Sequence, residues 1–176
     1  MDFTDRQLQR YARHIVLPEV GGVGQEKLLN AKVLVIGAGG LGAPLLLYLA
    51  AAGIGTLGVV DDDEVDLSNL QRQVIHGVGD IGAAKVASAA NSVRSINPEI
   101  DFRTHHVRMD AGNILEIFAG YDIIADGSDN FATRFLVNDA CHLAGKALVS
   151  AAILRFEGQI STFKSHLGPE FPCYRC

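Results

Sequence analysis

The chain is short of cysteine, of basic charge and of long apolar runs. Three cysteines among 176 residues, two of them in the last four positions, form no disulfide framework, so we expect a reducing, cytoplasmic setting. Fifteen basic residues against twenty acidic ones give a net charge of −5, which argues against binding to nucleic acid or to a membrane surface. The longest apolar stretch, residues 41–54, is too short and too bounded by glycine to span a bilayer.

Signals for export, internal repetition and a second domain are also missing. Residues 1–5 are polar and acidic and do not resemble the apolar core of a signal peptide. No repeat, low-complexity run or linker interrupts the rest. Since 48% of the residues are hydrophobic and 20% are charged, the composition suits one soluble domain with a sizeable core over residues 1–176.

A glycine-rich turn organises the rest of the sequence. The apolar run 33–36 enters residues 37–42 (Gly-Ala-Gly-Gly-Leu-Gly), and the helix-favouring segment 45–52 follows. This pattern predicts a buried parallel strand, a tight turn spaced as G-x-G-x-x-G, and a helix start. Free amide groups and the helix dipole attract phosphate at such a turn, and glycine lets it approach the backbone. Asp61 ends the next apolar strand, 56–60, where an acid commonly holds ribose hydroxyls, so we expect a nucleotide site.

Apolar runs alternate with amphipathic segments along the remaining chain. We expect further strands over residues 100–107, 121–126 and 147–153, and helices over 4–14, 25–30, 81–96, 113–118 and 131–144. Residues 156–163 alternate in polarity, which predicts an antiparallel strand. The expected fold class is therefore α/β: a Rossmann-like, doubly wound, mainly parallel sheet with an antiparallel extension after residue 155.

Charged residues gather where these strands end. Residues 62–66 hold four acids, which would repel a nucleotide unless a cation or basic side chains such as Arg72 and Lys85 intervene. Lys85 is expected in the first turn of its helix, where it opposes the dipole, so a functional role explains it better than a plain surface position. Asp126 and Asp129 end another strand, and helix capping is the alternative to nucleotide contact there.

Three other features have simple structural explanations. His105 and His106 are adjacent and point to opposite faces of a strand, so we expect neither to be catalytic. Cys141 lies inside a helix and is expected to be a small core residue. The arginine-rich helix 4–14 fits a solvated surface helix as well as a functional one.

Taken in order, these motifs resemble the superfamily of ATP-dependent activating enzymes. It includes the sulfur-carrier adenylyltransferases of molybdopterin-synthase and thiamine biosynthesis and the ubiquitin-activating enzymes. The resemblance covers essentially the whole chain and depends on residues 10–14 (RYARH), 37–42, 61–63, 67–73 (LSNLQRQ), 82–85 (GAAK), 96–98 (INP), 126–130 (DGSDN) and 172–176 (PCYRC). Each motif alone is weak, but the ordered set is specific and favours ATP over a dinucleotide.

The resemblance implies a role for each matching residue. Gly40 and its neighbours approach the nucleotide through their backbone, and Asp61 takes the ribose hydroxyls. The expected nucleotide contacts are completed by Ser68, Asn69, Leu70, Gln71, Arg72 and Lys85, of which Asn69, Arg72 and Lys85 hold the phosphates. Asp129 coordinates Mg²⁺, and Asn130 flanks the site. Arg13 reaches the ATP of the other subunit, because this family forms homodimers whose N-terminal helix crosses over. The expected catalytic residues are Arg72, Asp129, Arg13 and Lys85.

The family's reaction is adenylation of the C-terminal Gly-Gly carboxylate of a ubiquitin-like sulfur carrier, giving an acyl-adenylate and pyrophosphate. A carboxylate is ionised at neutral pH, so no general base is needed and catalysis is expected from positioning and charge neutralisation. Cys173 and Cys176 match one C-x-x-C arm of a Cys₄ Zn²⁺ site. The family's second C-x-x-C lies further on, so the chain is expected to be an ATP-binding adenylation domain truncated at a zinc half-site.

Two other functions stay open at this point. An NAD-dependent oxidoreductase explains the glycine turn and Asp61 but gives no role to Arg72, Lys85 or Asp129. A non-catalytic scaffold subunit of an activating enzyme would only dock a partner, although such subunits typically lack the nucleotide residues present here. The sequence does not identify the carrier or its pathway.

Overall fold

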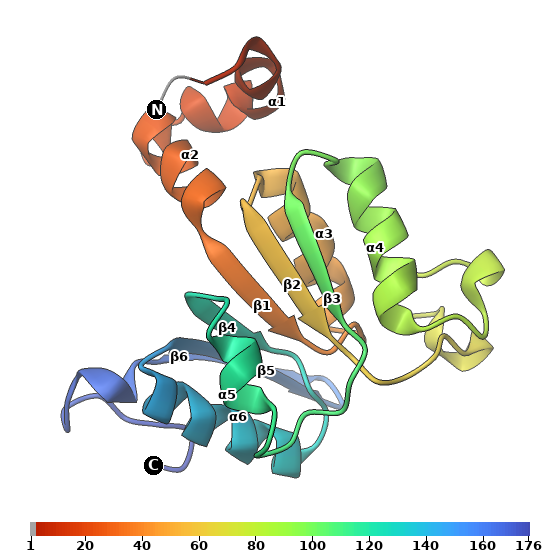
Figure 1. Ribbon diagram of the computed structural model, residues 1–176, viewed down its shortest axis with the longest axis vertical. Helices are drawn as coiled ribbons and strands as arrows, with labels where there is room; N and C mark the ends of the chain where they lie inside the picture. The colour runs from red at the N-terminus through yellow and green to blue at the C-terminus, as the bar shows by residue number, and fades with distance from the viewer. Residues whose placement is uncertain (1–2) are drawn as a thin grey trace.

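One six-stranded sheet runs through the computed structural model, which describes residues 3–176 (Figure 1). The spatial order is β3-β2-β1-β4-β5-β6, and neighbours are parallel except for the antiparallel hairpin of β5 and β6. The strands are β1 (Lys32–Ile36), β2 (Thr56–Val60), β3 (Asp101–His105), β4 (Ile123–Asp126), β5 (Ala147–Leu154) and β6 (Glu157–Phe163). The expected α/β fold class and its antiparallel extension are confirmed.

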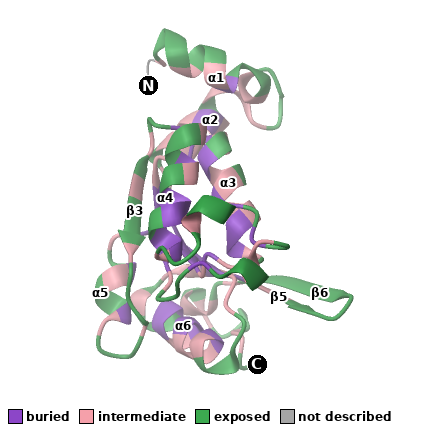
Figure 2. Cartoon of the chain, turned by 90° about the vertical axis from the view of Figure 1, so that its right-hand side faces the viewer, coloured by how far each residue is buried: buried purple, intermediate pink, exposed green. Residues whose placement is uncertain are grey.

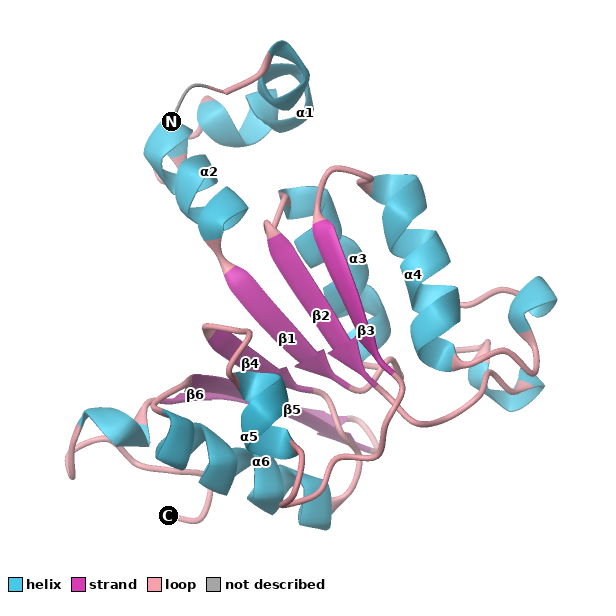
Figure 3. Cartoon of the chain, in the orientation of Figure 1, coloured by secondary structure: helices cyan, strands magenta, loops and turns pink. Residues whose placement is uncertain are grey.

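Helices cover both faces of this sheet (Figure 3). One layer is α3 (Gly42–Ala52) and α4 (Lys85–Ile96), and the other is α5 (Ile114–Phe118) and α6 (Phe131–Ala144). Alternate residues of β1 face the two layers, so all of 33–36 is buried, which explains its continuous apolar run. Within residues 3–176, no helix combines the length and hydropathy needed to cross a bilayer.

Two N-terminal helices, α1 (Asp5–Ile15) and α2 (Gly21–Asn30), lie at the end of the sheet where the strands begin (Figure 1). They are fixed to the C-terminal ends of α3 and α4. Asn97 Nδ2 donates to the buried hydroxyl of Tyr11 (2.9 Å), and Gln25 Nε2, fully buried, donates to Ala52 O (2.9 Å). Arg10 Nη1 donates to Ile96 O (2.8 Å). The pair therefore forms an anchored arm rather than a loose extension.

The start of α4 departs from the sequence prediction, because residues 81–84 are not helical. Their backbone groups pair instead with the acidic segment 62–66: the N–H of Val65 donates to Ala83 O (2.9 Å), and that of Lys85 donates to Asp63 O (2.9 Å). Gly82, with φ of +83°, makes the reversal that this pairing needs. A long-range pairing thus overrides local helix propensity.

The hairpin of β5 and β6 extends from the body and is exposed along its outer part (Figure 2). Its turn places Arg155 in the left-handed region, with φ of +57°, and leaves Leu154 and Phe156 largely in solvent. The buried residues are concentrated instead in the central strands and in α3, α4 and α6 (Figure 2).

Candidate nucleotide site

A crevice of about 610 Å³ opens where the parallel strands end. Its walls are the glycine turn, the end of β2 with residues 61–63, the start of α4, residues 107–109 and residues 127–134. The crevice lies at the point where the chain switches faces, since β1 is followed by α3 on one face and β4 is preceded by α5 on the other. Open α/β sheets bind their ligands at this position.

The glycine turn is shaped to expose amide groups. Gly37 has φ of +88°, and a Cβ on Gly42 would lie 1.7 Å from the carbonyl oxygen of Gly37, so only glycine fits there. Gly40 is exposed to the crevice. Within residues 3–176, the amide groups of residues 40–42 donate to no acceptor. They are therefore available to phosphate oxygens at the start of α3.

Asp61 is held at the rim of the turn. Its Oδ2 accepts from the N–H of Ala38 (2.8 Å), and its Oδ1 accepts from the N–H of Asp63 (2.9 Å). Each carboxylate oxygen keeps a lone pair for a further donor, such as a ribose hydroxyl.

Two basic side chains converge on the crevice from different segments. Arg72 leans against the turn, since a Cβ on Gly40 would lie 3.6 Å from its Cδ, and its Nη1 donates to Ser68 O (3.2 Å). Lys85 is buried, and its Nζ lies 2.7 Å from Oδ2 of Asp63, whose side chain is 67% exposed. This ion pair offsets the unfavourable position of a lysine at a helix N-terminus.

The loop after β4 closes the far wall. Asn130 Oδ1 accepts from the N–H of Thr133 (2.9 Å), so Asn130 caps α6 while also lining the crevice. Asp126 is buried. Its carboxylate accepts one hydrogen bond from the backbone N–H of Ser128 and another from the hydroxyl of Ser150. Asp129 is exposed to the crevice and has no partner among the described residues. Carboxylate oxygens of Asp61, Asp62 and Asp63 lie within 4.8 Å of one another. Together with Asp129, which lines the same crevice, they are ligands of the kind that Mg²⁺ prefers.

Several expected site residues lie outside this crevice. Residues 68–71 do not line it. Asn69 Oδ1 accepts from the N–H of Asp66 (3.1 Å), and Asp66 Oδ1 accepts from that of Ser68 (2.8 Å), so this segment shapes the turn that carries Arg72. Arg13 is exposed on α1, at the opposite end of the sheet. His105, which was not expected to be catalytic, also lies outside the crevice, where its Nε2 contacts the hydroxyl of Tyr121 (2.8 Å).

Two residues that sequence reasoning missed face the glycine turn. Gln73 is 4% exposed, and its buried Oε1 has no partner within residues 3–176, which suits a polar ligand. His76 is also buried: Nε2 contacts Ala38 O (3.1 Å) and Nδ1 contacts Ser88 Oγ (2.8 Å). Burial lowers the pKa of His76, so the neutral ring supports the turn. Gln73 ends the motif 67–73 but was given no role of its own, and the only sequence signal for His76 was its proximity to Arg72.

Arg134 was also missed. It follows the Asp-Asn pair by one helical turn, which places it on the same face of α6 as Asn130. Its side chain lines the crevice and is only 7% exposed.

The C-terminal C-x-x-C is fixed against α6. The N–H of Tyr174 donates to Asn138 Oδ1 (2.8 Å), and Arg175 donates to both carboxylate oxygens of Asp139 (2.8 and 2.6 Å). Sγ of Cys173 lies 3.3 Å from Sγ of Cys176, and this contact lowers the pKa of the Cys173 thiol. A second cavity of about 290 Å³ lies between this segment and the hairpin of β5 and β6.

Residues 11–176 match the ThiF family, so the chain belongs to the ThiF family, and the resemblance stated from the sequence is confirmed. It is 60% identical over 157 residues to the probable adenylyltransferase/sulfurtransferase MoeZ of Mycobacterium tuberculosis, covering 89% of this chain and 40% of that protein. It is 48% identical over 178 residues to the sulfur carrier protein adenylyltransferase of Thermus thermophilus, covering 100% of this chain and 66% of that protein. The chain thus spans less than two thirds of these relatives.

A solved structure shares the fold at greater distance. MccB of E. coli, crystallised with AMPCPP and MccA, matches with a TM-score of 0.84 and 26% identity. The match covers 95% of this chain and 51% of the MccB chain.

Proposed function

We propose that this chain is the ATP-binding domain of an adenylyltransferase that transfers AMP to the C-terminal glycine carboxylate of a ubiquitin-like sulfur carrier. The observation that carries the proposal is that Arg72 and Lys85 line the same crevice as the free amide groups of the glycine turn. The name of the Thermus thermophilus relative and the presence of AMPCPP in the MccB structure support it.

The arrangement suits an attack of one anion on another. The triphosphate lies along the amide groups of residues 40–42, while Asp61 receives the ribose hydroxyls. A carboxylate oxygen of the carrier attacks the α-phosphorus, and the bond to the bridging oxygen breaks, so pyrophosphate leaves with the electron pair. Arg72 and Lys85 reduce the repulsion between the anions and stabilise the charge on the departing group. No residue has to remove a proton, because the carboxylate is already ionised.

A divalent cation is part of the proposal. Asp129 and the carboxylates of residues 61–63 offer the oxygen donors that fit Mg²⁺. Mg²⁺ held there would supply positive charge to the phosphates. Asp129 has no competing partner among the described residues, which supports it as the main ligand.

We also propose that the enzyme is a homodimer in which Arg13 of the partner subunit completes the crevice. Tyr11 fixes α1 to Asn97 and Gln25 fixes α2 to Ala52, at the end of the sheet where the strands begin, whereas the crevice lies at the carboxyl ends of the strands. Arg13 therefore cannot reach the nucleotide of its own chain.

The thiols of Cys173 and Cys176 fit one arm of a tetrahedral Zn²⁺ site, because they are adjacent and held in place by Tyr174 and Arg175. Such thiols require a reducing compartment, so the proposal places the protein in the cytoplasm. An NAD-dependent oxidoreductase is disfavoured by the family match, and a scaffold role leaves Arg72 and Lys85 in the crevice unused.

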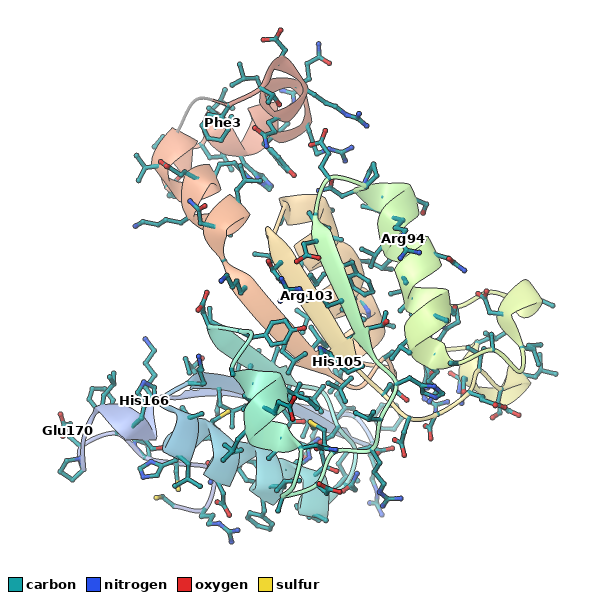
Figure 4. The ribbon with its side chains drawn as sticks, in the orientation of Figure 1. Phe3, Arg94, Arg103, His105, His166 and Glu170 are labelled. Carbon is teal, nitrogen blue, oxygen red and sulfur yellow. The ribbon has the colours of Figure 1, made fainter. Side chains whose placement is uncertain are left out.

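The test is carrier-dependent ATP–pyrophosphate exchange, measured with a panel of ubiquitin-like carriers that end in Gly-Gly. Replacing Arg72→Ala or Asp129→Ala should reduce the exchange rate on the order of 10²-fold or more without unfolding the domain. Arg94→Ala is the matched control, since Arg94 is exposed on α4 and outside the crevice (Figure 4). Near-full exchange by either crevice variant, or none by the wild type, would refute the proposal.

A further inference from the structure

Arg134 is a buried cation that forms no ion pair among the described residues. Within that part of the chain its guanidinium has one hydrogen bond, in which Nη2 donates to the carbonyl oxygen of Ser128. The buried carboxylate of Asp126 accepts hydrogen bonds from Ser128 and Ser150, and it forms no ion pair with Arg134. A buried charge is costly unless it is paired, so this environment favours an anion supplied by a ligand.

The position of Arg134 indicates what kind of ligand would supply this anion. It lines both the nucleotide crevice and the second cavity of about 290 Å³. The strand residues that line the second cavity include the small Ser150, Ala151, Ala152 and Ser161, and Phe163, Pro172 and Tyr174 line it as well. The aromatic and proline rings narrow the cavity, so it suits an extended chain that itself lacks bulky side chains. Arg134 therefore stands where a narrow peptide tail entering from one cavity would meet a nucleotide lying in the other.

We propose that Arg134 binds the C-terminal carboxylate of the acceptor and holds it beside the α-phosphate, at the junction of the two cavities. A guanidinium presents parallel N–H donors that match the two oxygens of a carboxylate. The pairing orients one oxygen for attack and lowers the repulsion that the tail meets on entering the crevice. This inference depends on the proposed function for its acceptor, but it concerns binding of the carboxylate and can be tested without turnover.

The experiment measures acceptor binding by calorimetry, with the full chain saturated by AMPCPP and Mg²⁺ so that no reaction occurs. Each Gly-Gly carrier of the exchange panel is prepared with a free C-terminal carboxylate and with a C-terminal carboxamide. A charge-assisted, two-point contact predicts that the wild type binds the carboxylate form about 10- to 100-fold more tightly. In Arg134→Gln this preference should disappear, while affinity for the carboxamide form and for AMPCPP alone changes less than about threefold.

A purely structural role for Arg134 would weaken the binding of both carrier forms alike. Arg134→Lys keeps the charge but loses the paired donors, so it should retain part of the preference and serves if Arg134→Gln fails to fold. Arg94→Gln should keep the full preference, because Arg94 lies outside both cavities.

Three results would overturn the inference. The first is a carboxylate preference that persists in Arg134→Gln, and the second is no preference in the wild type. The third is a loss of AMPCPP affinity in Arg134→Gln as large as its loss of affinity for the carboxylate form of the carrier. The two proposals can fail separately. If the wild type supports no ATP–pyrophosphate exchange but Arg134→Gln still loses the carboxylate preference, the proposed adenylation is refuted and this inference stands.

Discussion

Gly42 packs directly against the backbone of Gly37, and this contact predicts how much stability the protein loses when Gly42 is replaced. A Cβ introduced by Gly42→Ala would lie 1.7 Å from the carbonyl oxygen of Gly37 and 2.8 Å from its carbon. Both atoms are backbone, so the turn itself must open. Overpacking of this kind costs about 1–3 kcal/mol or more, whereas alanine in place of glycine in a helix gains at most about 1 kcal/mol. A separation of 1.7 Å between backbone atoms belongs at the upper end of this range, so about 3 kcal/mol less about 1 leaves a net loss in the free energy of unfolding of about 2 kcal/mol or more.

Gly40→Ala is the matched comparison. Its Cβ would meet the side chain of Arg72, whose Cδ lies nearest at 3.6 Å, and contacts of this length are ordinary. We expect its unfolding free energy to stay within about 0.5 kcal/mol of the wild type. MgATP affinity should nevertheless fall at least about tenfold, because the methyl group stands where the phosphates approach. Urea unfolding and calorimetry measure the two quantities. Equal stability of both variants would refute the reasoning about the turn.

Three further predictions follow from individual side chains. Lys85→Met should cost at most about 1 kcal/mol of stability, since its partner Asp63 stays hydrated, but should lower carrier-dependent exchange on the order of 10²-fold. Burial raises the pKa of the Cys141 thiol to about 12, so iodoacetamide at about pH 8 should label Cys173 and Cys176 of the metal-free native protein but spare Cys141, as read by mass spectrometry. Because burial lowers the pKa of His76 in the folded state, the unfolded state binds its proton more tightly, and stability should fall as the pH drops below about 6.5; urea unfolding of His76→Gln should show a shallower fall.

The central strands and the glycine turn could be predicted from the sequence because their signals are local. A continuous apolar run such as 33–36 needs burial on both faces, and the glycines that follow it fit only a tight turn. Asp61 was identifiable for the same reason, since it directly follows a buried strand. The order of the strands then brings these segments to one edge of the sheet.

The remainder of the site depends on contacts between distant segments. The pairing of residues 62–66 with residues 82–85 delays α4 and places Lys85 against Asp63, and no local pattern specifies it. In the sequence, Arg134 is one charged residue among others on an amphipathic helix. Its role depends on the two cavities that it lines, and these are formed by segments distant in the sequence. Asn69 carried a family motif, but its side-chain oxygen is engaged in capping its own turn.

The central claim is that Arg72 and Lys85 neutralise a triphosphate held by the glycine turn. The most direct test of this account is a crystal structure of the chain with AMPCPP and Mg²⁺. The account predicts a triphosphate lying against the amide groups of residues 40–42, with the guanidinium of Arg72 and Nζ of Lys85 within about 3.5 Å of phosphate oxygens. A nucleotide bound elsewhere, or a triphosphate directed into solvent with both basic groups turned away from it, would contradict the account.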